Sequence, residues 1–191
     1  LVNFKLRHIC VFSIKKIMKS GKNIVFLGMM GSGKTSIGYS ISKKLDLEFF
    51  DTDRFIEKAL NMKISKIFKN KGEIFFREYE EKIILDILKK KNIVIALGGG
   101  SFLNKKIRDE ILANHLSFWL KCDNKTIIKR IKNSSKRPIA YNATNNELND
   151  MIKVRSKYYM KAKYKVECSG LSKNEVINQI ISIYENKEIN N

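Results

Sequence analysis

Residues 28–35 constrain the fold of this chain more than any other feature, because they form the phosphate-loop pattern G-x-x-x-x-G-K-[ST]. The apolar run Ile24–Leu27 precedes this loop, and an amphipathic stretch that begins at Ser36 follows it. A strand, a glycine-rich loop and a helix in this order are the context in which the pattern binds a nucleotide phosphate. A glycine-rich turn without a ligand is the alternative, and the flanking elements argue against it.

The loop offers several kinds of group to a phosphate. Its glycines allow the backbone to wrap tightly with its N–H groups pointing inward, at the N-terminus of the following helix. Lys34 is expected to reach the β- and γ-phosphates, and the Thr35 hydroxyl is expected to bind Mg²⁺. The predicted nucleotide-binding residues of this segment are Gly31, Ser32, Gly33, Lys34, Thr35 and Ser36.

Size and composition indicate one globular α/β domain. The 191 residues suffice for a substantial core, and 43% of them are hydrophobic. The three cysteines, Cys10, Cys122 and Cys168, lack C-x-x-C spacing, which argues against a disulfide framework or a zinc site. We therefore expect reduced cysteines in a cytoplasmic protein.

The formal net charge of +19 raises the question of a nucleic-acid partner. The lysines are spread along the chain among Asn and Ile residues, without a concentrated basic arm. This dispersion favours a solvated surface that attracts anionic small molecules, so we expect no nucleic-acid partner.

The apolar run Ile9–Phe12 is too short to span a membrane, and we expect no membrane association.

Residues 1–17 mix apolar and basic side chains and are interpreted as an N-terminal extension, either a non-native start or a disordered segment. A targeting segment is the weaker alternative.

From Asn23 onward, strand patterns alternate with helical ones, which predicts βαβ units around a parallel sheet. The expected strands are 24–27, 47–50, 93–97, 116–120 and 165–168, and the expected helices are 34–45, 54–60, 65–68, 73–90, 105–113, 125–131, 147–160 and 173–184.

Residues 132–146 interrupt this alternation with a polar stretch that has neither helical nor strand periodicity. A loop of this length in a compact domain is usually functional or disordered. In a phosphoryl-transfer enzyme it would serve as a lid, and its closure would bring the charge of Arg137, next to Pro138, to the transferring group. A merely mobile loop is the alternative.

Two aspartates follow the second predicted strand, at Asp51 and Asp53. Open parallel sheets place their ligands at the carboxyl ends of strands, so both carboxylates are site candidates. One can hold the water shell of Mg²⁺ while the other accepts a hydroxyl proton from an acceptor substrate. The alternative is that Asp53 or Thr52 only caps the following helix.

Arg77 and Glu80 are three residues apart in an amphipathic helical stretch and can pair on one face. An arginine held in place in this way suits bidentate binding of a carboxylate or phosphate, and an ordinary surface ion pair is the alternative.

Three glycines at 98–100 follow an apolar strand and suggest that a ligand approaches their N–H groups. Arg155, four residues before Tyr159, is a further candidate cation.

The ordered set of motifs resembles the shikimate kinase family over about residues 22–185. The resemblance rests on the phosphate loop, Asp51-Thr52-Asp53, Phe76-Arg77 with Glu80, the triple glycine, Arg137-Pro138, and Arg155 with Tyr159. It implies a three-layer α/β/α sandwich of the nucleoside-monophosphate-kinase type with a five-stranded parallel sheet. It also implies transfer of the γ-phosphoryl group of ATP to the 3-hydroxyl of shikimate, in the pathway to chorismate and aromatic amino acids.

The resemblance further implies a role for each matched residue. On the acceptor side, Arg77 and Arg155 would clamp the shikimate carboxylate, Asp53 would bind the ring hydroxyls and act as base, and Gly99 and Gly100 would add backbone contacts. Residues 18–191 would then form one kinase domain, with an acceptor-binding region at about 51–90 and a lid at about 132–146.

On the donor side, the resemblance implies that Lys34 and Arg137 stabilise the charge on the transferring phosphoryl group. Arg130 would stack on the adenine of ATP, and Arg137 would also contact the nucleotide. Thr35 would bind Mg²⁺ directly, and Asp51 would act through water.

Two rival interpretations stay open. Another small-molecule kinase of the same fold, such as a gluconate kinase, would share the phosphate loop. A regulatory GTPase or nucleotide-dependent RNA-binding module would suit the net positive charge of the chain, but residues 124–127 and 186–189 lack the final Asp of the guanine-reading Asn-Lys-x-Asp motif.

We expect ATP and shikimate as the binding partners, a monomeric protein, and a cytoplasmic location.

Overall fold

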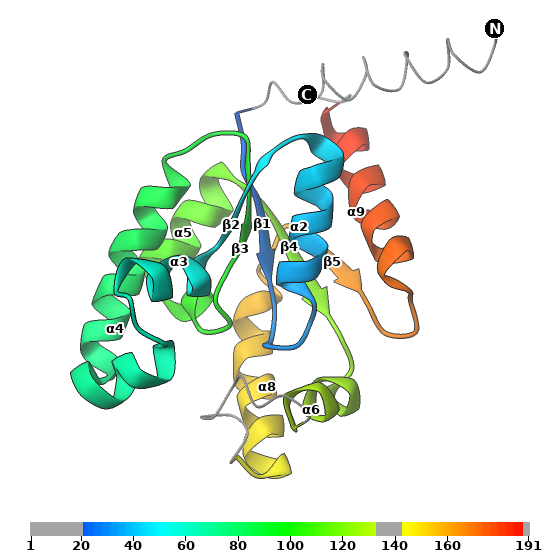
Figure 1. Ribbon diagram of the computed structural model, residues 1–191. Helices are drawn as coiled ribbons and strands as arrows, with labels where there is room; N and C mark the ends of the chain where they lie inside the picture. The colour runs from blue at the N-terminus through cyan, green and yellow to red at the C-terminus, as the bar shows by residue number, and fades with distance from the viewer. Residues whose placement is uncertain (1–20, 133–142, 189–191) are drawn as a thin grey trace, which may run out of the picture.

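Five parallel strands form one sheet in the order β2-β3-β1-β4-β5 (Figure 1). The structure is a computed structural model that describes residues 21–132 and 143–188, without the side chains of residues 187 and 188. The strands are β1 (Ile24–Leu27), β2 (Glu48–Asp51), β3 (Ile93–Ala96), β4 (Leu116–Lys121) and β5 (Tyr164–Glu167). This confirms the predicted α/β class with its five-stranded parallel sheet.

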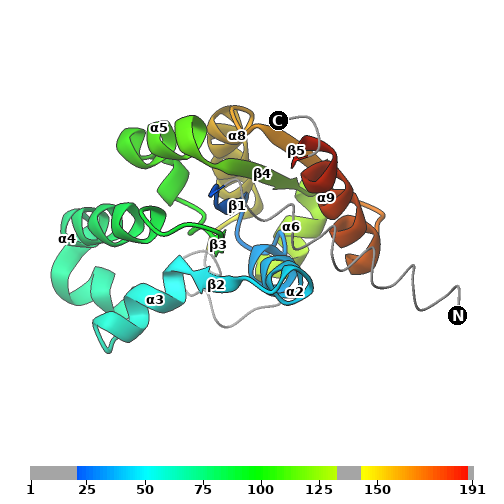
Figure 2. The same cartoon turned by 90° about the horizontal axis from the view of Figure 1, so that it is seen from above.

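Helices cover both faces of this sheet, so the molecule has three layers (Figures 1 and 2). Side chains of α2 and α9 pack on one face, and those of α4, α5, α6 and α8 pack on the other. The helices are α2 (Lys34–Leu45), α3 (Thr52–Ala59), α4 (Ile64–Leu88), α5 (Lys105–Asn114), α6 (Asn124–Lys132), α8 (Asn145–Tyr159) and α9 (Lys173–Glu188), with a short 3₁₀ turn, η1 (Ser101–Leu103).

Two interior strands, β1 and β3, are buried between the two helical layers. All four residues of each are apolar and buried, which is the pattern of parallel strands covered by helices on both faces. β2 lies at one edge of the sheet, and its last residue, Asp51, is only half-buried. The carboxyl ends of β1, β2 and β3 therefore bring the phosphate loop, the paired aspartates and the triple glycine to one edge of the sheet.

Helix boundaries differ from the predicted ones in several places. The expected helices 65–68 and 73–90 are parts of α4, which is interrupted at Gly72, where φ is 81°. The helix expected from Arg54 begins at Thr52, directly after β2. The turn η1 was not predicted, because three residues are too few to show periodicity.

Part of the predicted lid and all of the N-terminal extension lie outside the described residues. Residues 1–17, Arg137 and Pro138 are among them. Helix α8 begins at Asn145 rather than at Glu147, because Thr144 and Glu147 form a capping box. Among the residues that the structure describes, no helix has the length and apolar character required to cross a membrane.

Asn23, just before β1, is a buried polar residue that joins three elements. Its side-chain amide donates to Leu88 O at 3.1 Å and to Lys90 O at 2.8 Å, and its Oδ1 accepts from Ile93 N at 3.2 Å. The side chain is fully buried. It therefore ties the start of β1 to the end of α4 and the start of β3, which carries the triple glycine.

We expect Asn23→Ala to lower the free energy of unfolding by about 3 kcal/mol, because it removes three hydrogen bonds, two of which are buried, to Leu88 O and from Ile93 N. Urea unfolding measures this change as a lower midpoint at an unchanged m-value. Asn114→Ala, at the exposed end of α5, is the matched control and should change stability by less than about 0.5 kcal/mol. Equal stability of both variants would contradict a structural role for Asn23.

Candidate active site

Three positions of the phosphate loop have the positive φ that favours glycine, and Gly31, with φ 84°, is one of them. Gly28 has φ 139°, and a Cβ placed there would lie 2.8 Å from Leu120 O of β4. Gly33 has φ 96° and stands at the N-cap of α2. Gly28 therefore allows the loop to pack closely against β4, and Gly33 leaves the backbone N–H groups at the N-terminus of α2 accessible to an anion.

Inside the loop, two side chains are placed to meet phosphate oxygens. Lys34 Nζ donates to Gly28 O at 2.8 Å and to Met29 O at 2.9 Å, so the ammonium group lies within the curve of the loop. Ser32 Oγ is buried and has no hydrogen-bond partner among the described residues. A buried hydroxyl of this kind is costly unless a ligand completes its hydrogen bonds, which fits a bound phosphate.

Thr35 and Asp51 meet at the end of β2. Thr35 Oγ1 donates to Asp51 Oδ2 at 2.6 Å, and Asp51 Oδ1 accepts from Arg54 N at 3.1 Å. The cap of α3 is therefore Asp51, and the alternative that Asp53 or Thr52 provides the cap is wrong. A hydroxyl and a carboxylate beside a phosphate loop are hard oxygen ligands, and this set fits Mg²⁺, which also takes phosphate oxygens and water.

A cavity of about 310 Å³ opens on the donor side of the loop. Arg130 Nη1 of α6 donates to Gly31 O at 3.0 Å and forms one wall of this cavity. Gly31, Ser32, Gly33, Ser36, Cys168 and Lys173 are among its other lining residues. Four of the predicted phosphate-binding residues and the predicted adenine-binding arginine therefore line one cavity.

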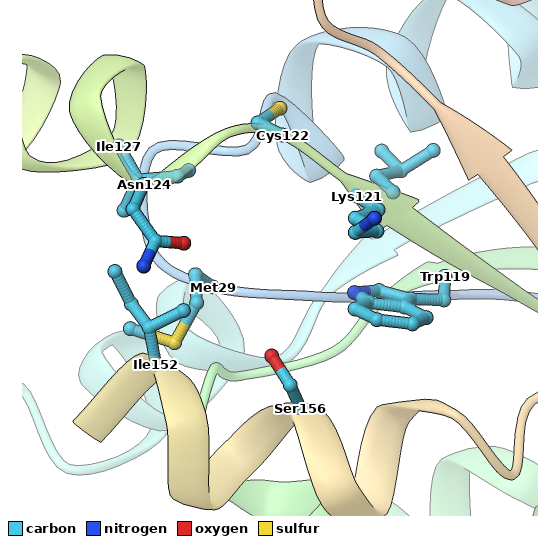
Figure 3. A pocket seen from close by; sticks show the side chains of 9 residues that line it. Met29, Trp119, Lys121, Cys122, Asn124, Ile127, Ile152 and Ser156 are labelled. Atoms are coloured by element: carbon cyan, nitrogen blue, oxygen red, sulfur yellow. The ribbon is translucent and has the colours of Figure 1, made fainter. Parts of the chain in front are cut away.

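A second cavity, of about 40 Å³, lies between the end of β4, α6 and α8 (Figure 3). Met29, Ile152 and Ser156 contribute to its lining, and Met29 belongs to the phosphate loop. Its volume accommodates water molecules only. A nucleotide therefore fits the larger cavity and not this one.

Arg77 of α4 is held by two carboxylates. Its Nη1 donates to Glu80 Oε2 at 2.7 Å, which confirms the predicted pairing, and its Nε donates to Glu73 Oε1 at 3.2 Å. Burial alone would lower the pKa of the guanidinium, but the charges and hydrogen bonds of Glu80 and Glu73 raise it above its usual value. The side chain remains 38% exposed, so Arg77 is a permanent, braced cation with room for a ligand.

Glu80 connects Arg77 to the triple glycine. It is 3% exposed, and its Oε1 accepts from Ser101 Oγ at 2.6 Å. Thr52 Oγ1, also buried, accepts from Gly98 N at 2.9 Å. These two bonds join α3 and α4 to the segment after β3, and the sequence pattern indicated neither of them.

The triple glycine is the point at which the candidate acceptor residues converge. A Cβ at Gly98 would lie 2.5 Å from Asp53 Oδ1, and one at Gly100 would lie 3.0 Å from Arg77 Nη1. A Cβ at Gly99 would lie 3.3 Å from Arg155 Nη1. A side chain at Gly98 would collide with the Asp53 carboxylate, and one at Gly99 or Gly100 would require a guanidinium group to shift.

Gly99 also touches the phosphate loop. A Cβ placed there would lie 3.5 Å from Met30 N and 3.7 Å from Gly28 O. Tyr159, on α8, donates its hydroxyl to Gly99 O and contacts Met29 Sδ at 4.0 Å. Burial raises the pKa of Tyr159 to about 12, although Arg155 acts in the opposite direction, so the hydroxyl stays protonated and donates.

The structure thus gathers the predicted residues into two adjoining groups. The donor group contains Gly31, Ser32, Gly33, Lys34, Thr35, Ser36, Asp51 and Arg130, and the acceptor group contains Asp53, Arg77, Gly99, Gly100 and Arg155. Arg137 lies outside the described residues. Sequence reasoning found no signal for Ser101, and it included Thr52 and Tyr159 only as members of matched motifs, without their bonds to Gly98 N and Gly99 O.

Comparisons with known proteins show what this chain is similar to. A family model described as shikimate kinase matches residues 30–185. The shikimate kinase of Thermodesulfovibrio yellowstonii is 39% identical over 165 residues, which cover 86% of this chain and 95% of the relative. That of Bacillus subtilis is 40% identical over 162 residues, which cover 84% and 87%. A solved shikimate kinase from Acinetobacter baumannii in complex with shikimate has a TM-score of 0.82 at 26% identity, covering 89% of this chain and 96% of that one.

Proposed function

Because this chain belongs to the shikimate kinase family, we propose that it transfers the γ-phosphoryl group of ATP to the 3-hydroxyl of shikimate. The products are shikimate 3-phosphate and ADP, and the step belongs to the pathway to chorismate and aromatic amino acids. One observation carries this assignment. Gly99 lies against both the phosphate loop and Arg155, so a small acid bound over the glycines has its hydroxyl groups near the γ-phosphate.

The donor half of the site binds ATP through the phosphate loop and the 310 Å³ cavity. Backbone N–H groups at the start of α2 and the Ser32 hydroxyl hold phosphate oxygens. Arg130, anchored on Gly31 O, supplies a planar cation on which adenine stacks. Lys34 moves from the loop carbonyls to the phosphates when ATP is present, because phosphate oxygens carry the stronger negative charge.

The acceptor half binds shikimate through charge and backbone. Arg77 and Arg155, which approach Gly100 and Gly99 respectively, form charge-assisted hydrogen bonds with the carboxylate. The N–H groups of both glycines and the carboxylate of Asp53 hold the ring hydroxyls. Glu80 keeps Arg77 in place, since its buried carboxylate is fixed by Ser101.

In the transfer step, the 3-hydroxyl oxygen attacks the γ-phosphorus as the bond to the ADP oxygen breaks. Asp53 accepts the hydroxyl proton, and Lys34 and Arg137 stabilise the charge on the phosphoryl oxygens. Such transfers need mainly correct positioning and fixed cations, and the residues above supply both.

Mg²⁺ fits the hydroxyl and carboxylate pair at the end of β2. Thr35 Oγ1 would hold it directly and Asp51 would hold it through water, next to the phosphates. When bound, Mg²⁺ neutralises phosphate charge during the transfer. The protein's own residues fix the two oxygens, since Arg54 N orients the Asp51 carboxylate.

The monomer is proposed as the active form, because every residue assigned to either substrate comes from one chain. Light scattering coupled to gel filtration at assay concentration tests this oligomeric state.

A cytoplasmic location is proposed because the enzyme consumes ATP, and cell fractionation tests this location.

A coupled assay of ADP release tests the function, with shikimate, gluconate and AMP compared as acceptors. We expect turnover with shikimate and at most background rates with the other two, because only shikimate presents a carboxylate to Arg77 and Arg155 and a ring hydroxyl to Asp53. A chain that begins at Met18 should be as active as the full chain if the extension has no catalytic role. A folded, ATP-binding preparation without shikimate-dependent turnover would refute the assignment.

A further inference from the structure

Cys122 and Cys168 stand next to each other at the carboxyl ends of two neighbouring strands. Lys121 of β4 and Glu167 of β5 are register partners, and the two cysteines are the next residues of each strand. Cys168 N also donates to Lys121 O at 2.7 Å, which continues the ladder. Adjacent strands are about 4.8 Å apart. Disulfides bridge Cα atoms roughly 4.4–6.8 Å apart, so this placement allows a bond between the two sulfurs.

Both thiols are free and partly exposed, and they interact with each other. The hydrogen bond from the Cys168 thiol and, to a smaller extent, the nearby Arg130 guanidinium together lower the pKa of Cys122 to about 7, against the effect of burial. The same interaction and burial raise the pKa of Cys168. Cys122 is therefore the more acidic thiol of the pair, and the thiolate is the reactive form of cysteine.

The pair also contacts the donor side of the active site. Cys168 lines the 310 Å³ cavity together with Gly31, Ser32 and Arg130. Cys122 Sγ lies 3.8 Å from Ser32 O of the phosphate loop. Figure 3 shows Cys122 just beyond the end of β4, where the chain turns towards α6, the helix that carries Arg130. Cys122 itself lines the smaller, 40 Å³ cavity and is partly exposed, so a small oxidant can reach Cys168 from the larger cavity and Cys122 from its own exposed side.

We propose that Cys122 and Cys168 form a redox-sensitive pair, which a hydroperoxide oxidises to a disulfide that weakens ATP binding. The Cys122 thiolate attacks a peroxide oxygen, the O–O bond breaks, and a sulfenic acid and hydroxide form. The Cys168 sulfur then attacks the Cys122 sulfur, the S–O bond breaks, and water leaves as the S–S bond forms. The two thiols supply the two electrons that reduce the peroxide.

The effect on ATP follows from the position of the pair, and it rests on the proposed nucleotide site. An S–S bond of about 2.05 Å draws the two sulfurs together and shifts the segment 168–172 against β4. It also removes the thiolate charge beside Arg130, the side chain proposed to stack on adenine. The shikimate-binding residues lie on α3, α4, α8 and the segment after β3, so binding of the acceptor should be unaffected.

The test uses the full chain with Cys10→Ser, so that Cys122 and Cys168 are its remaining thiols. Titration with hydrogen peroxide should remove both thiols, and the intact mass should fall by two hydrogen atoms. The KM for ATP should rise about fivefold with an unchanged KM for shikimate, and dithiothreitol should reverse both changes. The mass is read without any activity, so failure of the disulfide is distinguishable from failure of the kinase assignment.

Matched variants carrying Cys122→Ser or Cys168→Ser in the same background are each compared before and after peroxide. Neither should form the intramolecular bond, and neither should show the reversible rise in the KM for ATP. Cys122→Ala and Cys168→Ala replace them if a serine variant fails to fold. Persistence of both free thiols in the parent would overturn the proposal, as would a disulfide that leaves the KM for ATP unchanged. An equal response in a single-cysteine variant would overturn it as well.

Discussion

Lys34→Ala should lower kcat by about a thousandfold, because its ammonium group stabilises charge that develops on the phosphoryl oxygens during transfer. The KM for ATP should change much less, since the loop N–H groups and Arg130 still bind the nucleotide. A loss confined to kcat is the signature of an interaction made mainly in the transition state. Steady-state kinetics with varied ATP at saturating shikimate measure both constants.

Lys43→Ala is the matched control for this variant. Lys43 lies in the last turn of the same helix, is exposed, and packs over the ring of Tyr39 at 5.6 Å. It should leave kcat within about a factor of two. Because Lys34 also bonds to Gly28 O and Met29 O, thermal unfolding of both variants must show that the loop change has not unfolded the domain. An unchanged kcat in folded Lys34→Ala would refute the role of Lys34 in transfer.

Arg77→Ala should raise the KM for shikimate by about a hundredfold, because two charge-assisted hydrogen bonds to the carboxylate are lost. The KM for ATP should stay nearly constant, since Arg77 lies on α4 and the nucleotide cavity is lined from the phosphate loop, α6 and α9. Arg77→Lys should recover part of the affinity, because an ammonium keeps the charge without the bidentate geometry. An equal loss of ATP affinity would contradict the assignment.

Two further variants separate binding from stability in this prediction. Arg77→Ala leaves Glu80 buried with an unpaired charge, which destabilises the fold. The double variant Arg77→Ala/Glu80→Gln removes that charge and should still show the raised KM for shikimate. Arg54→Ala, exposed on the neighbouring helix α3, is the control and should leave the KM for shikimate unchanged.

The donor side of the site was predictable because its residues are consecutive. One loop and the first turn of one helix contain Gly31 to Ser36, so their spacing along the chain is also their spacing in space. The interior strands β1, β3 and β4 were predictable for a similar reason, since buried parallel strands are short, mainly apolar runs. Boundaries shifted by a residue or two where a cap decided them, as at Asp51 and Thr144.

The acceptor side was only partly predictable. The pair of Arg77 and Glu80 is local and follows from helical periodicity. The bonds from Ser101 to Glu80 and from Gly98 N to Thr52 join residues 21 and 46 positions apart, and no local pattern encodes them. Their motifs entered the prediction through a family resemblance, and the structure supplied the contacts.

By itself, the sequence determined a phosphate-binding βαβ unit, an α/β sandwich and the list of side chains that a kinase of small hydroxylated acids requires. Such features are local, because loop geometry and the burial pattern of a strand depend on neighbouring residues. Only the tertiary structure decided that Gly99 lies between the phosphate loop and Arg155, and that Cys122 and Cys168 lie side by side. Both depend on the order of strands in the sheet, because that order brings together residues far apart along the chain.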